Sequence, residues 1–209
     1  MAIAFLALAT VACKTEGKKV DTKDAEIVKE KVVNPINSYK ANIADSKITW
    51  TGSKPTGSHN GDLKITSGVF DIENGIVKAG EFTIDMNSIN CLDLEAGKGK
   101  EKLEGHLKNA DFFDVEKFPT AKFVVTNSEV KDGANVITGN LTLKETTKSI
   151  SIPVTVSEAD GIATIISESF KIDRTEFGVT YKSKSIDAAL KDKFIDDLME
   201  FTIAIKAKK

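Results

Sequence analysis

Two histidines, two cysteines and a single arginine are the residues of this sequence best suited to a reactive or metal-binding site. His59 and His106 stand far apart, and without a third histidine a metal site would need carboxylates supplied by the fold. The sequence contains no GxSxG, HExxH or CxxC pattern and no phosphate-binding glycine loop. We therefore expect no catalytic residue, no metal and no cofactor, and predict that the protein is not an enzyme.

Arg174 is the one arginine in a chain otherwise supplied with lysine. Arginine is favoured where a planar guanidinium pairs with a carboxylate or a phosphate through two parallel hydrogen bonds. One interpretation is structural: Arg174 bridges a nearby acid and fixes the turn that follows Asp173. The other places Arg174 beside the anionic headgroup of a ligand. The residues alone leave both interpretations open.

The N-terminus has the pattern of an export signal. Residues 1–12 are apolar, too few to span a bilayer, and end in small residues directly before Cys13. This predicts a lipoprotein signal peptide, cleaved so that Cys13 carries the lipid, with a plain secretory signal as the alternative. Cys91 then has no disulfide partner and is expected to be a small apolar residue. The predicted location is the bacterial cell envelope: a lipoprotein of the outer or inner membrane that faces the periplasm, or a protein secreted into it.

Residues 13–42 are rich in lysine and acidic residues and lack sustained apolar periodicity. This composition predicts a flexible linker, followed by a single domain over residues 43–209. The net charge is −2, with lysines spread along the chain and matched by acids. No basic surface is indicated, so nucleic acid is not an expected partner.

From residue 43 onward, apolar and polar residues alternate in short segments, as at Ile150 and Ile152, which is typical of strands with one buried face. Many strands joined by hairpins predict an antiparallel sheet that closes into a barrel. Its charged outward faces argue against an outer-membrane barrel. One helix is expected at residues 97–108, where Lys, Glu and Leu replace β-branched residues. Glycine-containing turn signals separate the strands, among them Asn60-Gly61, Asn74-Gly75 and Asp160-Gly161.

The inward face of such a barrel is almost entirely apolar. An eight-stranded barrel can fill its interior with side chains or hold one small ligand, and the pattern leaves both open. His106, Arg174 and the lysines of residues 98–102 are candidates to meet a polar headgroup. Phe112 and Phe113 are adjacent, so we expect one ring to enter the barrel and the other to pack beneath the helix. The residues expected to line a cavity are Trp50, Phe82, Ile84, Met86, Phe112, Phe113, Phe123, Leu141, Ile152, Phe170 and Ile203.

Three segments in order resemble the YceI-like, polyisoprenoid-binding family: HLKNADFFDVEKFPTAKFVVTNSEV, VITGNLTLKETTKSISIPVTV and FKIDRTEFGV. The earlier WTGSKPTGSHNGDLKITSGVF is similar to the first hairpin of that family. The positions that carry the family markers are His106, Leu107, Asp111, Phe112, Phe113, Pro119, Gly139, Leu141, Thr142, Asp173 and Arg174.

This resemblance, over residues 45 to 207, implies a lipocalin-like, eight-stranded antiparallel β-barrel with one inserted helix. It also implies a lipid-binding protein of the periplasm or envelope that holds an isoprenoid or other long apolar ligand inside the barrel. Two alternatives stay open: a non-catalytic stress-response or structural protein with a packed barrel, and an accessory protein that binds a quinone-like ligand. A membrane partner through the N-terminal lipid is expected, and a homodimer is open.

Overall fold

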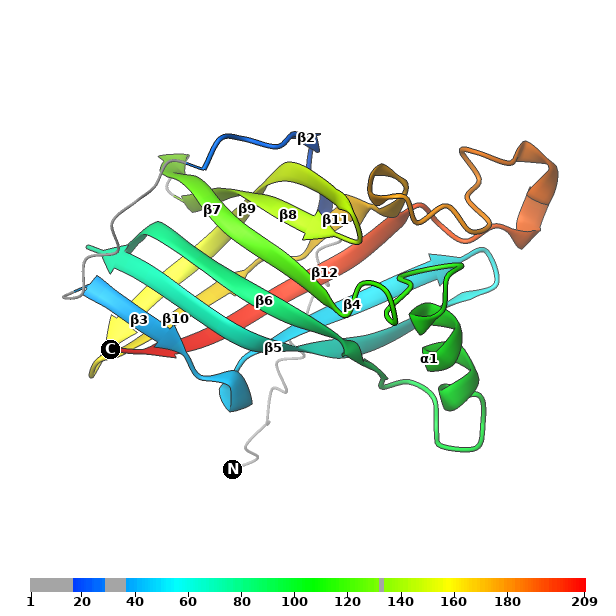
Figure 1. Ribbon diagram of the computed structural model, residues 1–209, viewed down its shortest axis with the longest axis horizontal. Coiled ribbons are helices and arrows are strands. Elements are labelled where there is room, and N and C mark those ends of the chain that lie inside the picture. Colours follow the sequence, from blue (N-terminus) through cyan, green and yellow to red (C-terminus); the bar gives the residue numbers. More distant parts are fainter. Residues whose placement is uncertain (1–16, 29–36, 132–133) are drawn as a thin grey trace, which may run out of the picture.

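A closed ring of antiparallel strands forms the body of the protein (Figure 1). The computed structural model describes residues 17–28, 37–131 and 134–209. β4 completes the ring by pairing with both β5 and β12, which confirms the predicted all-β, eight-stranded antiparallel barrel. β11 continues β10 along β12, so the two count as one position in the ring. The strands are β4 (Lys47–Lys54), β5 (Gly57–Glu73), β6 (Ile76–Cys91), β7 (Thr120–Lys131), β8 (Ala134–Leu143), β9 (Thr146–Ala159), β10 (Ile162–Ser167), β11 (Phe170–Asp173) and β12 (Leu198–Lys208).

Two of these strand pairs are joined by tight turns in which two consecutive residues take a positive φ. Asn74 and Gly75, at φ of 53° and 72°, connect β5 to β6, and Asp160 and Gly161, at 51° and 73°, connect β9 to β10. Glycine, asparagine and aspartate tolerate this region of φ, which is why the sequence predicts these turns correctly. The prediction was wrong for Asn60-Gly61, which lies inside β5 and pairs with β4.

The two ends of the barrel carry different elements (Figure 1). Helix α1 (Lys100–Lys108) lies at one end, together with the long segment between β11 and β12 that contains the 3₁₀ helices η3 (Arg174–Phe177) and η4 (Ala188–Lys193). The helix predicted for residues 97–108 is therefore confirmed with a later start. Gly97 and Gly99 have φ of 74° and 105°, which α-helical backbone does not allow.

At the opposite end, one strand position is divided in two. β3 (Ser38–Ala41) and β4 both pair with β5 and β12, and the short 3₁₀ helix η2 (Ile43–Asp45) separates them. The barrel therefore begins at Ser38, inside the range that the sequence predicts as linker.

Residues 17–28, called the N-terminal strap below, also differ from a free linker. They run along the barrel where β11 has separated from β9: β1 (Lys18–Lys19) pairs with β11, and β2 (Lys23–Asp24) pairs with β9. Val20 is buried, and its backbone N–H donates to the carbonyl of Lys171 at 2.9 Å. Pairings of two residues are too short to produce an alternating pattern, so the sequence does not reveal them. The predicted signal peptide and Cys13 lie outside the described residues.

Both ends of the strap are fixed by polar contacts. Asn140 accepts a hydrogen bond from the backbone N–H of Glu26 at 2.9 Å and donates one to its carbonyl at 2.7 Å. The carboxylate of Glu26 accepts a further hydrogen bond from Thr126 at 2.6 Å. Near the other end, Lys19 forms an ion pair with Asp173 at 3.2 Å. The strap is thus a docked part of the barrel wall.

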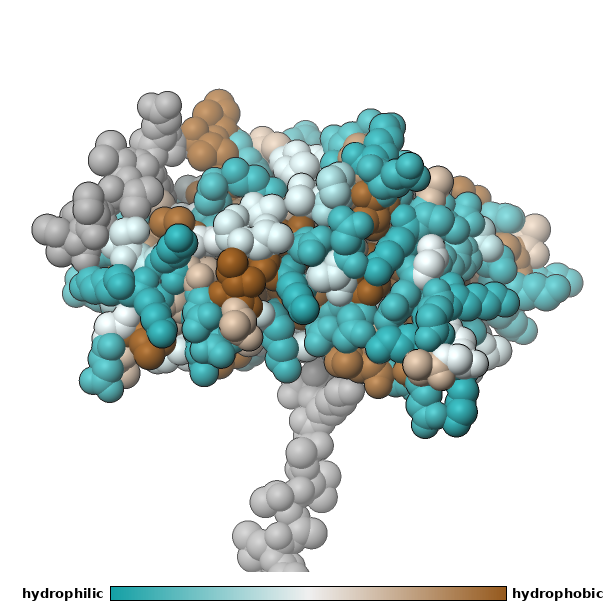
Figure 2. All heavy atoms as spheres, turned by 60° about the horizontal axis from the view of Figure 1, so that its bottom comes forward, coloured by the Kyte–Doolittle hydropathy of each residue, from teal (hydrophilic) through white to brown (hydrophobic). Residues whose placement is uncertain are grey.

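The outer faces of the strands are polar, as the alternation predicts. On β7, Ala121, Phe123 and Val125 are buried, whereas Lys122 is exposed. The face drawn in Figure 2 is largely hydrophilic, with hydrophobic residues in small separate groups. None of the helices in the described ranges has the length and apolar composition needed to cross a lipid bilayer.

We expect Asn140→Ala to release the strap. The change removes both hydrogen bonds to the Glu26 backbone, and it should lower the free energy of unfolding by about 1–3 kcal/mol. Hydrogen exchange should accelerate in residues 17–28 and stay unchanged in β12. Asn127→Ala, at an exposed position of the neighbouring β7, is the matched control. Unaltered exchange in the strap of the Asn140 variant would contradict this account.

Candidate functional site

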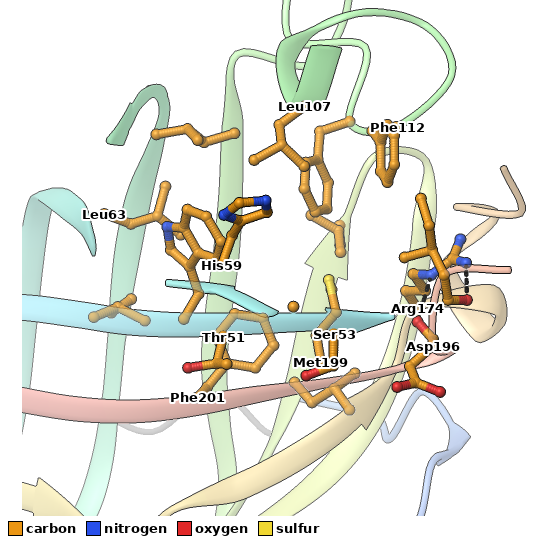
Figure 3. Close-up of a pocket in the computed structure, with 18 of the residues that line it drawn as sticks. Thr51, Ser53, His59, Leu63, Leu107, Phe112, Arg174, Asp196, Met199 and Phe201 are labelled. Atoms are coloured by element: carbon orange, nitrogen blue, oxygen red, sulfur yellow. Dashed lines mark hydrogen bonds between the residues drawn. The ribbon is translucent and has the colours of Figure 1, made fainter. Parts of the chain in front are cut away.

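The end of the barrel that carries α1 contains a cavity of about 530 Å³ that is partly open to solvent. Strands from all sides of the ring contribute to its wall, and Leu103 and Leu107 of α1 contribute from the end. In the close-up, Leu107 and Phe112 point toward it from one side, while His59, Leu63, Met199 and Phe201 approach from the strands (Figure 3). The wall is mostly apolar, as in pockets that bind small apolar molecules.

All eleven cavity residues predicted from the sequence line this space, and so do the headgroup candidates His106 and Arg174. Contact with a ligand stays a prediction for each of them. The eleven are Trp50, Phe82, Ile84, Met86, Phe112, Phe113, Phe123, Leu141, Ile152, Phe170 and Ile203.

Alternation explains why the strand residues meet in one space. Successive side chains on a strand point to opposite faces, so every second residue of each strand enters the barrel. The same rule would have found further lining residues that the sequence prediction left out. Other lining residues come from segments without period two, where sequence offers no such signal. The first kind includes Leu63, Leu143, Ile150, Ile172, Met199 and Phe201, and the second Leu103, Leu107, Tyr181 and Phe194. Ile89 also lines the cavity, but an irregularity in the pairing of β5 with β6 puts it out of phase with Met86.

The indole of Trp50 packs across the backbone of Gly61 on the neighbouring strand. A Cβ atom at Gly61 would lie 2.5 Å from Cζ2 of Trp50 and would collide with the carbonyl oxygen of Asn90. Glycine is therefore required at this place by close approach and not by a turn. The indole Nε1 is buried without a hydrogen-bond partner in the described part of the chain, so Trp50 contributes apolar surface to the wall.

Residues 109–119 form a compact segment between α1 and β7. The backbone N–H of Phe113 donates to the carbonyl of Leu107 at 3.1 Å, and that of Phe118 donates to Asp114 at 2.8 Å. Asp114 takes a φ of 48° within this turn. Because the chain is not extended here, alternation does not separate the two phenylalanine rings. Both Phe112 and Phe113 line the cavity, so the prediction of opposite directions was wrong.

His106 belongs to an aromatic cluster at the cavity wall. Its ring meets Phe112 and Tyr181 edge-on, with centroid distances of 4.9 and 5.0 Å. Its Nε2 also lies 3.1 Å from the carboxylate of Asp111. One ring nitrogen is thus already engaged within the chain. A role for His106 toward a headgroup stays a prediction.

Arg174 is almost fully buried, and its guanidinium holds the segment between β11 and β12. It donates hydrogen bonds to the backbone carbonyls of Ile195 and Asp196, both at 3.0 Å (Figure 3). It donates a third to the backbone carbonyl of Val179 at 2.6 Å. Asp197 lies 3.5 Å away as an ion pair. Burial lowers the pKa of Arg174, while the nearby carboxylates act in the opposite direction. These contacts match the interpretation that Arg174 has a structural role, because its N–H groups donate to backbone carbonyls of the chain.

A second polar cluster, not predicted from the sequence, lies beside the cavity wall at His59. The carboxylate of Asp93 accepts hydrogen bonds from the backbone N–H of Asn60 at 2.9 Å and from the buried thiol of Cys91 at 3.2 Å, and it lies 2.8 Å from Nδ1 of His59. Burial alone would raise the pKa of Asp93, but these contacts outweigh it and lower that pKa to about 2. Burial and the bond to Asp93 raise the pKa of the Cys91 thiol, so it is not an activated nucleophile. The cluster fixes the end of β6 against β5.

The lysines that border the cavity are not those expected from the sequence. Lys54, Lys182 and Lys193 lie along its lining, whereas the lysines of residues 98–102 do not. Lys100 instead donates to the side chain of Asn90 at 2.9 Å. Within the described ranges, no group of three or more His, Cys, Asp or Glu residues is arranged to hold a metal ion.

Comparison with known proteins decides the family. Residues 39–207 match the model of the YceI-like domain. This chain belongs to the YceI-like domain family. A UPF0312 protein of Enterobacter sp. (strain 638) is 38% identical to this YceI-like chain over 84 residues, which are 40% of the chain and 40% of that relative. The chain therefore matches well under half the length of this curated relative.

Two solved structures share the fold of the YceI-like domain, each with a TM-score of 0.58. Burkholderia cenocepacia BcnA is 20% identical, and the match covers 80% of this chain and 99% of BcnA. A polyisoprenoid binding domain from Saccharophagus degradans is 12% identical, with 81% of this chain and 97% of that chain covered. At these identities the likeness concerns the fold.

We expect a tryptophan to cost little stability at a position that lines the cavity and to destabilise the protein at a buried position elsewhere in the barrel. Ile152→Trp, at the cavity wall, should change the free energy of unfolding by less than about 1 kcal/mol, because the indole has space to enter. Ile165→Trp, at a buried position outside the cavity lining, should lower it by about 1–3 kcal/mol. Urea unfolding of both variants measures the difference. Equal losses would show that the cavity does not exist in solution.

Proposed function

We propose that this YceI-like protein binds an isoprenoid or a similar long apolar lipid inside its barrel. The observation that carries the proposal is the cavity of about 530 Å³ with a predominantly apolar wall drawn from every part of the ring. Each CH₂ group transferred from water into such surroundings contributes roughly 0.8 kcal/mol. An apolar chain can therefore be held without any charged partner in the interior.

The character of the wall favours a branched hydrocarbon chain. It combines isoleucine and leucine side chains with many aromatic rings, among them Phe82, Phe112, Phe123 and Phe170. The structural neighbour from Saccharophagus degradans is a polyisoprenoid binding domain, which supports this choice of ligand class. Of the alternatives, a completely packed barrel agrees poorly with the cavity. The structure gives no specific reason to prefer a quinone-like ligand or a homodimer.

The binding proposal is tested on the intact purified chain. Organic extraction followed by mass spectrometry should release an isoprenoid, and the extracted protein should take up added isoprenoid alcohols. Ile152→Trp should lower this uptake at least tenfold while the protein stays folded, because its indole occupies the ligand space. Absence of isoprenoid in the extract together with no uptake by the unaltered chain would overturn the proposal.

We further propose that the protein acts in the bacterial cell envelope, attached to a membrane through a lipid on Cys13. The support is the apolar segment at residues 1–12, with its small residues directly before that cysteine. A lipid-bound protein next to a bilayer would have direct access to isoprenoid ligands. Cells grown with labelled palmitate should label the unaltered chain and not Cys13→Ala, which should leave the membrane fraction. Persistent labelling of the variant would contradict attachment at Cys13.

A further inference from the structure

We propose that two phenylalanines form a floor across the barrel and limit the isoprenoid chain inside it to roughly twenty carbons. These residues, Phe82 and Phe123, are called the aromatic floor below. This inference rests on the proposed binding function and adds to it the size of the ligand and the residues that determine that size.

The cavity ends at the same depth on β5, β7, β9 and β12. Leu63 lines it, but Ile65, the next inward residue of β5, does not. The same step of two residues separates Ile203 from Ile205 on β12. On β9, Ile152 lines the cavity and Val154 does not. On β7, the same holds for Phe123 and Val125. This cavity therefore occupies one half of the interior and ends at this level.

The aromatic floor occupies this level. Phe82 and Phe123 are directly paired across β6 and β7, with ring centroids 5.5 Å apart. Phe70 continues the row on β5 at 6.4 Å from Phe82. On β8, a Cβ atom at Gly139 would lie 2.7 Å from Cε1 of Phe123 and would collide with Cζ of that ring, so the absent side chain leaves the space that the ring uses. One row of rings thus crosses from β5 to β7, and the last ring lies against Gly139 of β8.

Buried apolar side chains occupy the barrel beneath the aromatic floor. Ile65 and Ile205 are each only 1% exposed, and Val77 is fully buried. None of these side chains touches the cavity, whereas Phe82 and Phe123 are buried and line it. A chain that enters from the end with α1 therefore stops at the two rings.

The volume above the floor gives the length of the chain. A dry apolar cavity of about 150 Å³ in another protein holds benzene, which has six carbons. On that scale, the 530 Å³ of this cavity accommodates roughly twenty carbons, or about four isoprene units. A longer chain must leave its remaining units outside, near Lys54, Lys182 and Lys193, where they would gain little from burial.

The test compares isoprenoid alcohols of increasing length, about 10, 15, 20, 30 and 40 carbons, with the extracted intact chain. Affinity should rise about tenfold with each added isoprene unit while the unit still enters the cavity, and it should level off near twenty carbons. Continued gain up to the longest alcohol would overturn the length limit but not the binding function. Failure of every alcohol to bind would overturn the binding function itself.

Variants then assign the limit to the floor. In Phe123→Ala, affinity should go on rising for about one more isoprene unit before it levels off, because the change removes the ring that ends the cavity. Phe123→Leu, a smaller change that preserves packing better, should extend this rise by less. Phe118→Ala, outside the cavity lining, is the matched control and should leave the length profile unchanged. A folded Phe123 variant with the length profile of the unaltered chain would overturn the role of the aromatic floor.

Discussion

Closure of the hydrogen-bonded ring between β4 and β12 is the constraint on which the rest of the structure depends. It places Ile48 opposite Ile203 and Trp50 opposite Phe201, so residues from distant parts of the sequence share the interior. A ring of eight strands has a nearly fixed width, which side chains can fill or leave partly empty. The protein does both, with branched side chains in one half and a cavity above Phe82 and Phe123 in the other.

Closure also leaves two open ends, and different chemistry covers each. At the filled end, Glu158 accepts hydrogen bonds from the hydroxyl of Tyr39 at 2.5 Å and from the backbone N–H of Gly75 at 3.0 Å. The bond to Glu158, then burial, raise the pKa of Tyr39, so this phenol stays protonated. At the end with the cavity, Arg174 holds the irregular segment between β11 and β12 in place. Its guanidinium donates hydrogen bonds to backbone carbonyls of this segment, which have no partner in a strand.

The sequence predicts the barrel well because its main signal, period two, is present over long stretches of the strands that form the ring. It also predicts the cavity residues on those strands, such as Ile152 and Phe170, since an inward residue of a hollow barrel must border the space. It fails where structure depends on contacts between distant segments. Gly61 has the local chemistry of a turn, and only the position of Trp50 shows why glycine is needed there. His59 and Asp93 likewise meet only after β5 and β6 have paired.

The docked strap changes how a lipid on Cys13 would hold the protein. Gly17, the first described residue, lies four positions beyond Cys13 in the sequence, and four residues extend at most about 14 Å. The attachment would therefore be short and would begin at the flank between β9 and β11, so the barrel would rest beside the bilayer on that flank. An apolar molecule that leaves the membrane would then meet the wall built by β9, β11 and Val20 before it reached the end with α1.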